Sequence, residues 1–125
     1  MISSPTNPLQ SKLLEPLKVL EGRQMGSVEF VQDYVQLRFD GPTITAFTWP
    51  RVQVSNKWFA WTEPGYRDEL CNRIARLVAR AFSTEQEIRI EFNDGATIAI
   101  SLSPDDARDV EVAIFDDPPN PTVVW

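Results

Sequence analysis

The side chains that usually carry enzyme chemistry are scarce in this sequence of 125 residues. Histidine is absent, which removes Ser–His and Cys–His nucleophile pairs, histidine general bases and the commonest zinc ligand sets. The single cysteine, Cys71, falls beside the apolar stripe of a predicted helix, which favours a small buried side chain over a catalytic thiolate. A Ser–Lys pair would need Lys12, Lys18 or Lys57, each in a predicted terminal or loop segment. The sequence therefore predicts no catalytic residue, no metal site and no cofactor.

One acidic motif matches a known metal-binding pattern. Asp105-Asp106-Ala107-Arg108-Asp109 has the spacing of the aspartate-rich DDxxD box, which holds magnesium and diphosphate in isoprenoid synthases. That box works on the wall of a large all-helical cavity, which a strand-rich chain of this length cannot build. The sequence favours a turn with solvated carboxylates here. A small histidine-free enzyme that uses carboxylate and arginine groups stays open as an alternative, since no pair of carboxylates stands out and none is excluded.

Two sets of residues could instead form a binding surface. The first set is aromatic and consists of Phe47, Trp49, Trp58, Phe59 and Trp61. The second set is an arginine row, Arg73, Arg76 and Arg80. Tryptophan is enriched at the energetic centres of protein interfaces, and arginines can pair with an acidic partner. The more ordinary interpretation is that the aromatic residues complete the core and that the arginines form a solvated helix face bridged to nearby carboxylates.

Charge and composition narrow the class of partner. The net charge is −6 with an isoelectric point near 4.6, which argues against nonspecific binding to nucleic acid or to an anionic membrane. The charge is compatible with a protein partner or with self-association, and it also serves solubility. A lone cysteine fits a reducing compartment, and the first residues lack the basic start and apolar core of a secretory signal, so we expect a cytoplasmic protein.

The elements that would position these residues are mainly strands. Alternating apolar residues over 87–92 and 97–102 flank Asn93-Asp94-Gly95, which predicts a hairpin. A similar pattern over 35–39 and 43–49 predicts a second hairpin, and residues 28–32 are expected to pair with 34–39. In the strand over 43–49, Phe47 and Trp49 lie on the side opposite Ile44 and Ala46. That side must be covered by another segment or exposed.

One long helix is predicted between the two hairpins, over residues 66–82. Its apolar positions recur at spacings of three and four, at Tyr66, Leu70, Ile74, Leu77, Val78 and Ala81. Thr62 is expected to cap its N-terminus. Further short strands are expected over 51–54 and 110–115. The resulting fold class is α+β, with an antiparallel, meander-type sheet of about six strands, one long helix packed on a face, and the order βββ-α-βββ.

The predicted domain organisation is simple. Residues 1–12 form a flexible N-terminus, residues 13–117 a single α+β domain, and residues 118–125 a proline-rich C-terminal tail. Within the domain, Leu13–Leu20 is expected to form a short strand or an irregular cover. The end of the tail, Val123-Val124-Trp125, either docks back on the domain or extends away from it.

Four segments together resemble a group of small bacterial proteins of unknown function. They are Leu20-Glu-Gly-Arg23, Val35-Gln-Leu-Arg-Phe-Asp-Gly41, Gly65-Tyr-Arg-Asp-Glu-Leu70 and Phe92-Asn-Asp-Gly95. Proteins that look like this sometimes act as immunity partners of bacterial toxins. The resemblance implies a bacterial origin and a noncatalytic, protein-binding role, and it transfers no catalytic residue. The sequence alone thus favours a binding protein, with a small enzyme and a structural homodimer as alternatives.

Overall fold

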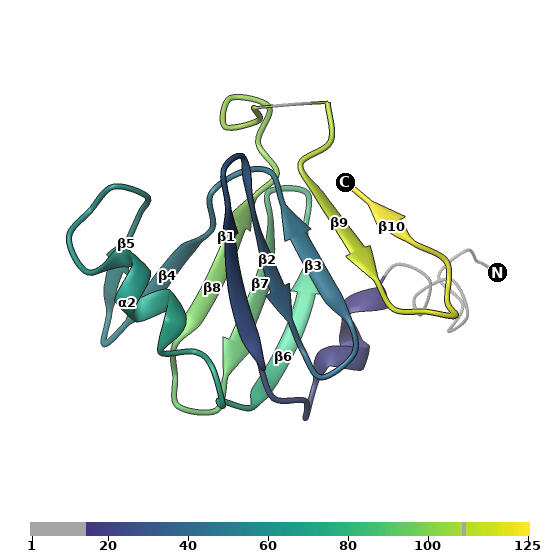
Figure 1. Cartoon of the computed structure of the whole chain (residues 1–125), viewed down its shortest axis with the longest axis horizontal. Helices are drawn as coiled ribbons and strands as arrows, with labels where there is room; N and C mark the ends of the chain where they lie inside the picture. Colours follow the sequence, from purple (N-terminus) through teal and green to yellow (C-terminus); the bar gives the residue numbers. More distant parts are fainter. Residues whose placement is uncertain (1–14, 109) are drawn as a thin grey trace, which may run out of the picture.

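The computed structural model describes residues 15–108 and 110–125 and consists mainly of strands in two antiparallel sheets (Figure 1). The first sheet contains β1 (Ser27–Val31), β2 (Tyr34–Arg38), β3 (Thr43–Ala46), β9 (Ala113–Asp116) and β10 (Val123–Val124), in that order. The second sheet has the order β5-β4-β8-β7-β6. Its strands are β4 (Arg51–Val54), β5 (Lys57–Phe59), β6 (Val78–Ser83), β7 (Glu87–Phe92) and β8 (Thr97–Ser101). The helical segments described are the 3-10 helix η1 (Pro16–Leu20) and α2 (Tyr66–Cys71).

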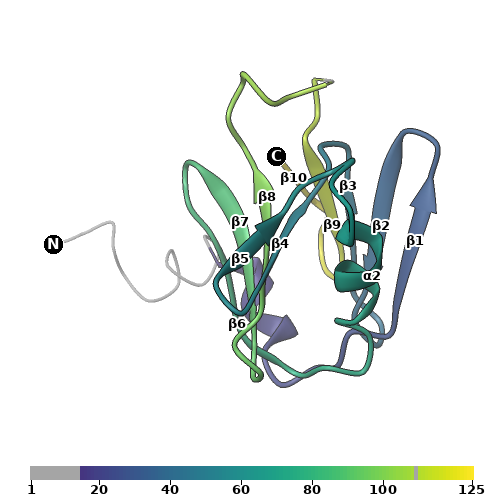
Figure 2. The same cartoon turned by 90° about the vertical axis from the view of Figure 1, so that its left-hand side faces the viewer.

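The two sheets form the layers of a β-sandwich, as the edge-on view in Figure 2 shows. Each sheet contributes alternate apolar residues to one shared core. Val35 and Leu37 of β2 are fully buried, and so are Ile88 and Ile90 of β7. Because side chains of a strand alternate between its faces, the intervening polar residues lie on the outer faces. The apolar alternation in the sequence is therefore the direct cause of this core.

The predicted hairpins are confirmed. β1 pairs with β2 around Gln32-Asp33, and β7 pairs with β8 around Asn93-Asp94-Gly95. Gly95 has a φ of 91°, a conformation that glycine adopts without the steric penalty of a Cβ. The similar segments at 35–39 and 88–92 lie in different sheets, β2 in the first and β7 in the second. Both turn their apolar residues into the same core.

The long helix predicted over residues 66–82 is wrong. The helix α2 ends at Cys71, and the chain re-enters a sheet as β6 from Val78. Ala75 has a φ of 74°, in the left-handed region, which a right-handed helix cannot contain. Ile74 and Leu77, which the periodicity assigned to a buried stripe, are 39% and 45% exposed.

A bulge in β6 explains why a strand imitated helical spacing. Val78 and Ala81 are both buried although they are three residues apart. The pairing of β6 with β7 shifts register between Val78 and Arg80, so one extra residue is inserted and both apolar residues face the core. Three-residue spacing in a sequence can thus arise from a bulged strand as well as from a helix turn.

The α+β fold class is therefore wrong as well, because the molecule is a mostly-β sandwich without a long helix on a sheet. The third predicted strand is shorter than expected: β3 ends at Ala46, and residues 47–50 cross to the second sheet. The strand expected over 110–115 is β9, which begins at Ala113 and pairs with β3. The end of the tail docks back, because β10 pairs with β9.

Two short segments close opposite sides of the sandwich. η1 packs against β6 and buries Leu17 and Leu20, so the segment predicted over 13–20 as a strand or an irregular cover is a covering 3-10 helix over 16–20, and residues 13 and 14 lie outside the described residues. α2 contacts both β4 and β1, and it buries Tyr66 and Leu70 between the two sheets. The predicted flexible segment 1–12 also lies outside the described residues. No helix in the described part of the chain is long and apolar enough to cross a membrane.

Candidate functional site

Two tryptophans meet where the chain crosses between the sheets. Trp49 belongs to the segment that leaves β3 for β4, and Trp61 belongs to the segment that joins β5 to α2. Their rings are stacked, with centroids 3.9 Å apart and an angle of 7° between the planes. Both rings pack against the core and remain half-buried. The stack therefore completes the core in part, as the more ordinary interpretation expects, and it also keeps an exposed part.

An arginine covers each end of this tryptophan pair. The guanidinium of Arg108 lies 5.2 Å from the ring centroid of Trp49, and that of Arg67 lies 4.9 Å from the ring centroid of Trp61. Arg67 also lies 5.7 Å from the ring centroid of Phe30, on β1. Cations over aromatic faces are attracted by the ring quadrupole. We call these five residues the tryptophan–arginine stack.

Arg108 anchors one end of the stack to the first sheet. Its guanidinium donates hydrogen bonds to the carbonyl oxygens of Asp33, at 3.1 Å, and Phe47, at 3.4 Å. Asp33 is in the β1–β2 turn, and Phe47 follows β3. The loop after β8 is thereby tied to two connections of the other sheet, and it covers Trp49. Of the two alternatives left open by the alternation of Phe47 and Trp49, cover by another segment is therefore the one observed at Trp49.

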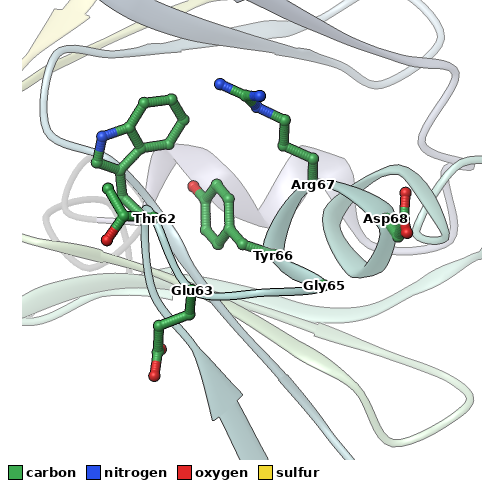
Figure 3. Close-up of a pocket in the computed structure, with 7 residues that line it drawn as sticks. Thr62, Glu63, Gly65, Tyr66, Arg67 and Asp68 are labelled. Carbon is green, nitrogen blue, oxygen red and sulfur yellow. The ribbon is translucent and has the colours of Figure 1, made fainter.

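A pocket opens beside the other end of the stack (Figure 3). Its volume is about 300 Å³, and its walls come from the segment between β5 and α2 and from the first turn of α2. The lining residues are Trp61, Thr62, Glu63, Gly65, Tyr66, Arg67 and Asp68. Gly65 lies in a left-handed conformation with a φ of 88°, and a Cβ there would come within 3.3 Å of the Phe59 ring. The path of the pocket wall therefore depends on glycine.

Tyr66 fixes the floor of the pocket. Its ring meets Trp61 edge to face, at 5.8 Å and 88°, and its buried hydroxyl donates a hydrogen bond to the carbonyl oxygen of Pro50. Burial raises the pKa of the Tyr66 hydroxyl, and the charge of Arg67 opposes that rise only in part. Tyr66 is thus a neutral hydrogen-bond donor that positions the chain, and it is not a proton acceptor at neutral pH.

The other aromatic residues of the predicted site lie apart from the tryptophan pair. Phe47 contacts Tyr34 edge to face at 5.7 Å. Trp58 pairs with Gln53, and its ring lies under the guanidinium of Arg51, 4.6 Å away, on the outer face of the second sheet. Phe59 lies under the amine of Lys57, at 4.8 Å. Of the five predicted aromatics, the structure brings Trp49 and Trp61 together.

The predicted arginine row is not one surface. Arg73 is buried, and its guanidinium donates two hydrogen bonds to the carboxylate of Asp94, at 2.7 and 2.8 Å. Arg76 reaches the same carboxylate at 3.8 Å. Arg80 lies on β6 and pairs with Glu91 at 3.4 Å. The row was predicted from one long helix, and without that helix Arg73 and Arg76 share Asp94 whereas Arg80 pairs with Glu91 on the second sheet.

Four residues of the site were missed from the sequence, namely Phe30, Tyr66, Arg67 and Arg108. Tyr66 was assigned to the apolar stripe of the long helix, and Arg67 falls within the same predicted helix. Arg108 was read only as part of the acidic motif. Within that motif the carboxylate of Asp106, in a turn at 104–106, accepts a hydrogen bond from the Ser101 hydroxyl at 2.6 Å, and residue 109 lies outside the described residues. The four tryptophans were a partial signal, because tryptophan is the aromatic ring that attracts a guanidinium most strongly, but they do not identify which arginines take part.

The groups near this site that could exchange a proton are constrained by their surroundings. Cys71, which follows the pocket on α2, is half-buried, and burial together with the charge of Asp68 raises the pKa of its thiol, which opposes thiolate formation. Glu63 uses its carboxylate to accept a hydrogen bond from the Ala60 N–H at 2.6 Å. Within residues 15–108 and 110–125, no group of three histidine, cysteine or acidic side chains could hold a metal ion. The pocket presents rings, the guanidinium of Arg67, the Thr62 hydroxyl and the carboxylates of Glu63 and Asp68.

The chain was compared with models of protein families, with curated proteins and with solved structures, and none of the three comparisons finds a match.

Proposed function

We propose that this protein is a noncatalytic binding protein that contacts a protein partner through the tryptophan–arginine stack and the pocket beside it. The observation that carries the proposal is the stacked pair Trp49–Trp61, held half-buried between two arginines. Tryptophan and arginine are the residue types most enriched among interface residues that dominate binding energy. A rigid ring pair loses little conformational freedom when a partner binds, so more of its contact energy is retained.

The pocket is better suited to hold a partner side chain than to perform catalysis. Its tyrosine hydroxyl is already engaged with Pro50, and Glu63 already binds a backbone N–H. General acid–base catalysis needs a side chain that is free to exchange a proton with the substrate. The immunity-like role implied by the sequence resemblance is a special case of this proposal, in which the partner is a toxin.

Photo-crosslinking tests the location of the binding surface. A benzophenone amino acid is placed at Thr62, an exposed residue of the pocket wall, and, as a control, at Glu85 in the β6–β7 connection. Both variants are expressed in the cell from which the gene comes. We expect a protein partner to be captured from Thr62 and not from Glu85. Capture from Glu85 alone contradicts the proposed surface.

The captured partner is then purified and its affinity is measured by calorimetry. We expect Trp61→Ala to weaken binding by about 30-fold or more, as loss of a dominant tryptophan at an interface does. Trp58→Ala is the matched control, because Trp58 is also half-buried under an arginine but lies on the outer face of the second sheet. Equal binding by wild type and the Trp61→Ala variant, with both variants shown to be folded, contradicts the proposal. So does the absence of any partner together with turnover in a substrate screen.

A further inference from the structure

Arg67 stands apart from the other arginines of the described chain. Its guanidinium makes no hydrogen bond and no ion pair with any residue that the structure describes. Every other arginine within residues 15–108 and 110–125 has a hydrogen-bond or ion-pair partner. They are Arg23, Arg38, Arg51, Arg73, Arg76, Arg80, Arg89 and Arg108. Six of these arginines pair with a carboxylate, and Arg23 and Arg108 donate to backbone carbonyl oxygens, whereas Arg67 has neither kind of partner among the described residues.

Arg67 is nevertheless held in place. Trp61 and Phe30 both contact its guanidinium, at 4.9 and 5.7 Å from their ring centroids. Phe30 is on β1 and Trp61 follows β5, so the two rings come from different sheets. A guanidinium that lies against aromatic rings keeps its N–H groups free, because those groups point outward in its own plane. Arg67 is therefore a positioned donor whose hydrogen-bonding capacity is unused.

The carboxylates nearest in sequence do not use this capacity. Glu63 and Asp68 line the same pocket, but neither forms an ion pair with Arg67. Figure 3 shows the Glu63 side chain directed to the opposite side of the pocket from Arg67, and Asp68 extending away from it. Glu63 is held there by the Ala60 N–H. The unpaired state of Arg67 thus follows from how the loop and α2 are built.

We infer that Arg67 is a receptor for a carboxylate presented by an acidic segment of the protein partner. The inference rests on the proposed function and names the chemistry of the bound group. A planar guanidinium binds a carboxylate through two parallel N–H donors, which matches the free edge of Arg67. The pocket of about 300 Å³ beside it has room for an acidic side chain. The half-buried ring of Trp61 supplies surface against which the methylene groups of that side chain pack.

The test measures carboxylate binding directly at Arg67. The probe is a nonapeptide in which glutamate alternates with leucine, and the matched probe has glutamine in place of each glutamate. Each is titrated into ¹⁵N-labelled protein while the Nε–H signal of Arg67 is followed by NMR, which detects even weak binding. We expect a saturable shift with the glutamate peptide and binding at least about tenfold weaker with the glutamine peptide.

Substitutions at Arg67 distinguish the two-point hydrogen bonding of a guanidinium from the effect of its positive charge alone. Arg67→Gln should abolish binding of the glutamate peptide, which is followed in this variant through the backbone NMR signals of the pocket residues. Arg67→Lys should weaken binding several-fold, because a lysine cannot form the two-point contact with a carboxylate. Arg80→Gln is the matched control, because Arg80 also lies over a ring, that of Phe82 at 4.7 Å, but is paired with Glu91. That variant should bind like the wild type.

Two results overturn the inference. One is the absence of a saturable shift of Arg67 with the glutamate peptide, and the other is an equal affinity for both peptides. Neither result touches the Trp61 dependence of partner binding, which tests the proposed function separately. Conversely, a partner that ignores Trp61 contradicts the proposed function whatever the peptides do. Since Arg67 is exposed and has no hydrogen bond in the described structure, its replacement leaves the fold intact, which a thermal melt of each variant verifies.

Discussion

Replacement of Asp94 by asparagine should destabilise the protein far more than its place in a hairpin turn indicates. The carboxylate of Asp94 accepts two hydrogen bonds from Arg73 and one, at 3.1 Å, from the N–H of Ala96. Arg73 comes from the segment between α2 and β6, so this contact joins the turn to a distant part of the chain. The Arg73 side chain is 4% exposed and that of Asp94 is 33% exposed.

The size of the effect follows from the burial of Arg73. Removing one partner of a buried charge pair costs about 3–5 kcal/mol, because the remaining charge is left without an anion. Water reaches the one-third exposed Asp94 and lowers this value, and an asparagine oxygen can still accept one hydrogen bond. The Nε atom of Arg73 is already buried without a hydrogen-bond partner, so loss of the Asp94 carboxylate would leave further guanidinium N–H groups unsatisfied. We therefore expect Asp94→Asn to cost about 2 kcal/mol.

Thermal and denaturant unfolding measure this cost. For a domain of this size, 2 kcal/mol corresponds to a fall in Tm of roughly 6–10 °C. The matched control is Glu91→Gln, which breaks the pair between Glu91 and the 64% exposed Arg80. An exposed pair contributes at most about 1 kcal/mol and is screened by salt. A double-mutant cycle of Arg73→Met with Asp94→Asn should give a coupling energy above about 1.5 kcal/mol.

The reasoning is refuted if Asp94→Asn and Glu91→Gln lower the free energy of unfolding equally. It is also refuted if the coupling between positions 73 and 94 is below about 0.5 kcal/mol, the usual limit of additivity. Either result would mean that water, and not Asp94, satisfies the guanidinium of Arg73.

Three further predictions concern the same scaffold. Burial pushes the pKa of Asp94 upward, but the hydrogen bonds from Arg73 and Ala96 and the nearby arginine charges hold it below its ordinary value. The stabilisation by this carboxylate is therefore present above the unfolded pKa of about 4 and is lost as pH falls through the folded pKa. When the free energy of unfolding is measured at decreasing pH, the Asp94→Asn variant should therefore lose less stability than the wild type. Tyr66→Phe should lower the free energy of unfolding, measured by chemical denaturation, by about 1 kcal/mol, because the carbonyl oxygen of Pro50 loses its buried donor. An unchanged denaturation midpoint would show that this hydrogen bond does not stabilise the fold. Ala75→Gly should raise stability by about 1 kcal/mol, because Ala75 has a φ of 74°, and a fall in Tm would contradict the strain argument.

The sequence predicted those parts of the fold that depend on neighbouring residues. The β7–β8 hairpin follows from the alternation of Ile88 and Ile90 with polar residues and from the glycine at position 95, all within one short window. The β1–β2 hairpin was predictable for the same reason. Each of these elements is specified by contacts between residues close in the chain.

The rest of the fold depends on contacts that the sequence does not display. Val78 and Ala81 gave a helical spacing, and only the pairing of β6 with β7 reveals the bulge that places both inward. The division into two sheets was also unpredictable, because it requires that the chain cross over after Ala46. Alternation shows that a strand has an apolar face, but it does not show which sheet that face completes.

Only the two tryptophans of the candidate site were predictable from the sequence, because the other residues join it through tertiary contacts. Trp49 and Trp61 were recognisable as candidates by residue type. Arg67 lies on α2 and Arg108 lies in the loop after β8. The tertiary fold brings both to the tryptophans, and no spacing in the sequence predicts these contacts. Arg73 was selected for a surface and is instead a buried partner of Asp94. Residue type thus indicated the tryptophan pair of the candidate site, and the long-range fold decided which charges lie beside it.

The strand order of the first sheet has a consequence for how the chain acquires its structure. β3 pairs on one side with β2 and on the other with β9, and every strand of the second sheet lies between β3 and β9 in the sequence. The three strands β1–β3 can assemble early, whereas one edge of Thr43–Ala46 stays unpaired until residues 113–116 reach it. During that interval a β-branched edge strand is open to pairing with another molecule. Conditions that slow the arrival of β9 should therefore favour aggregation over folding, and the segment Thr43–Ala46 is where that competition takes place.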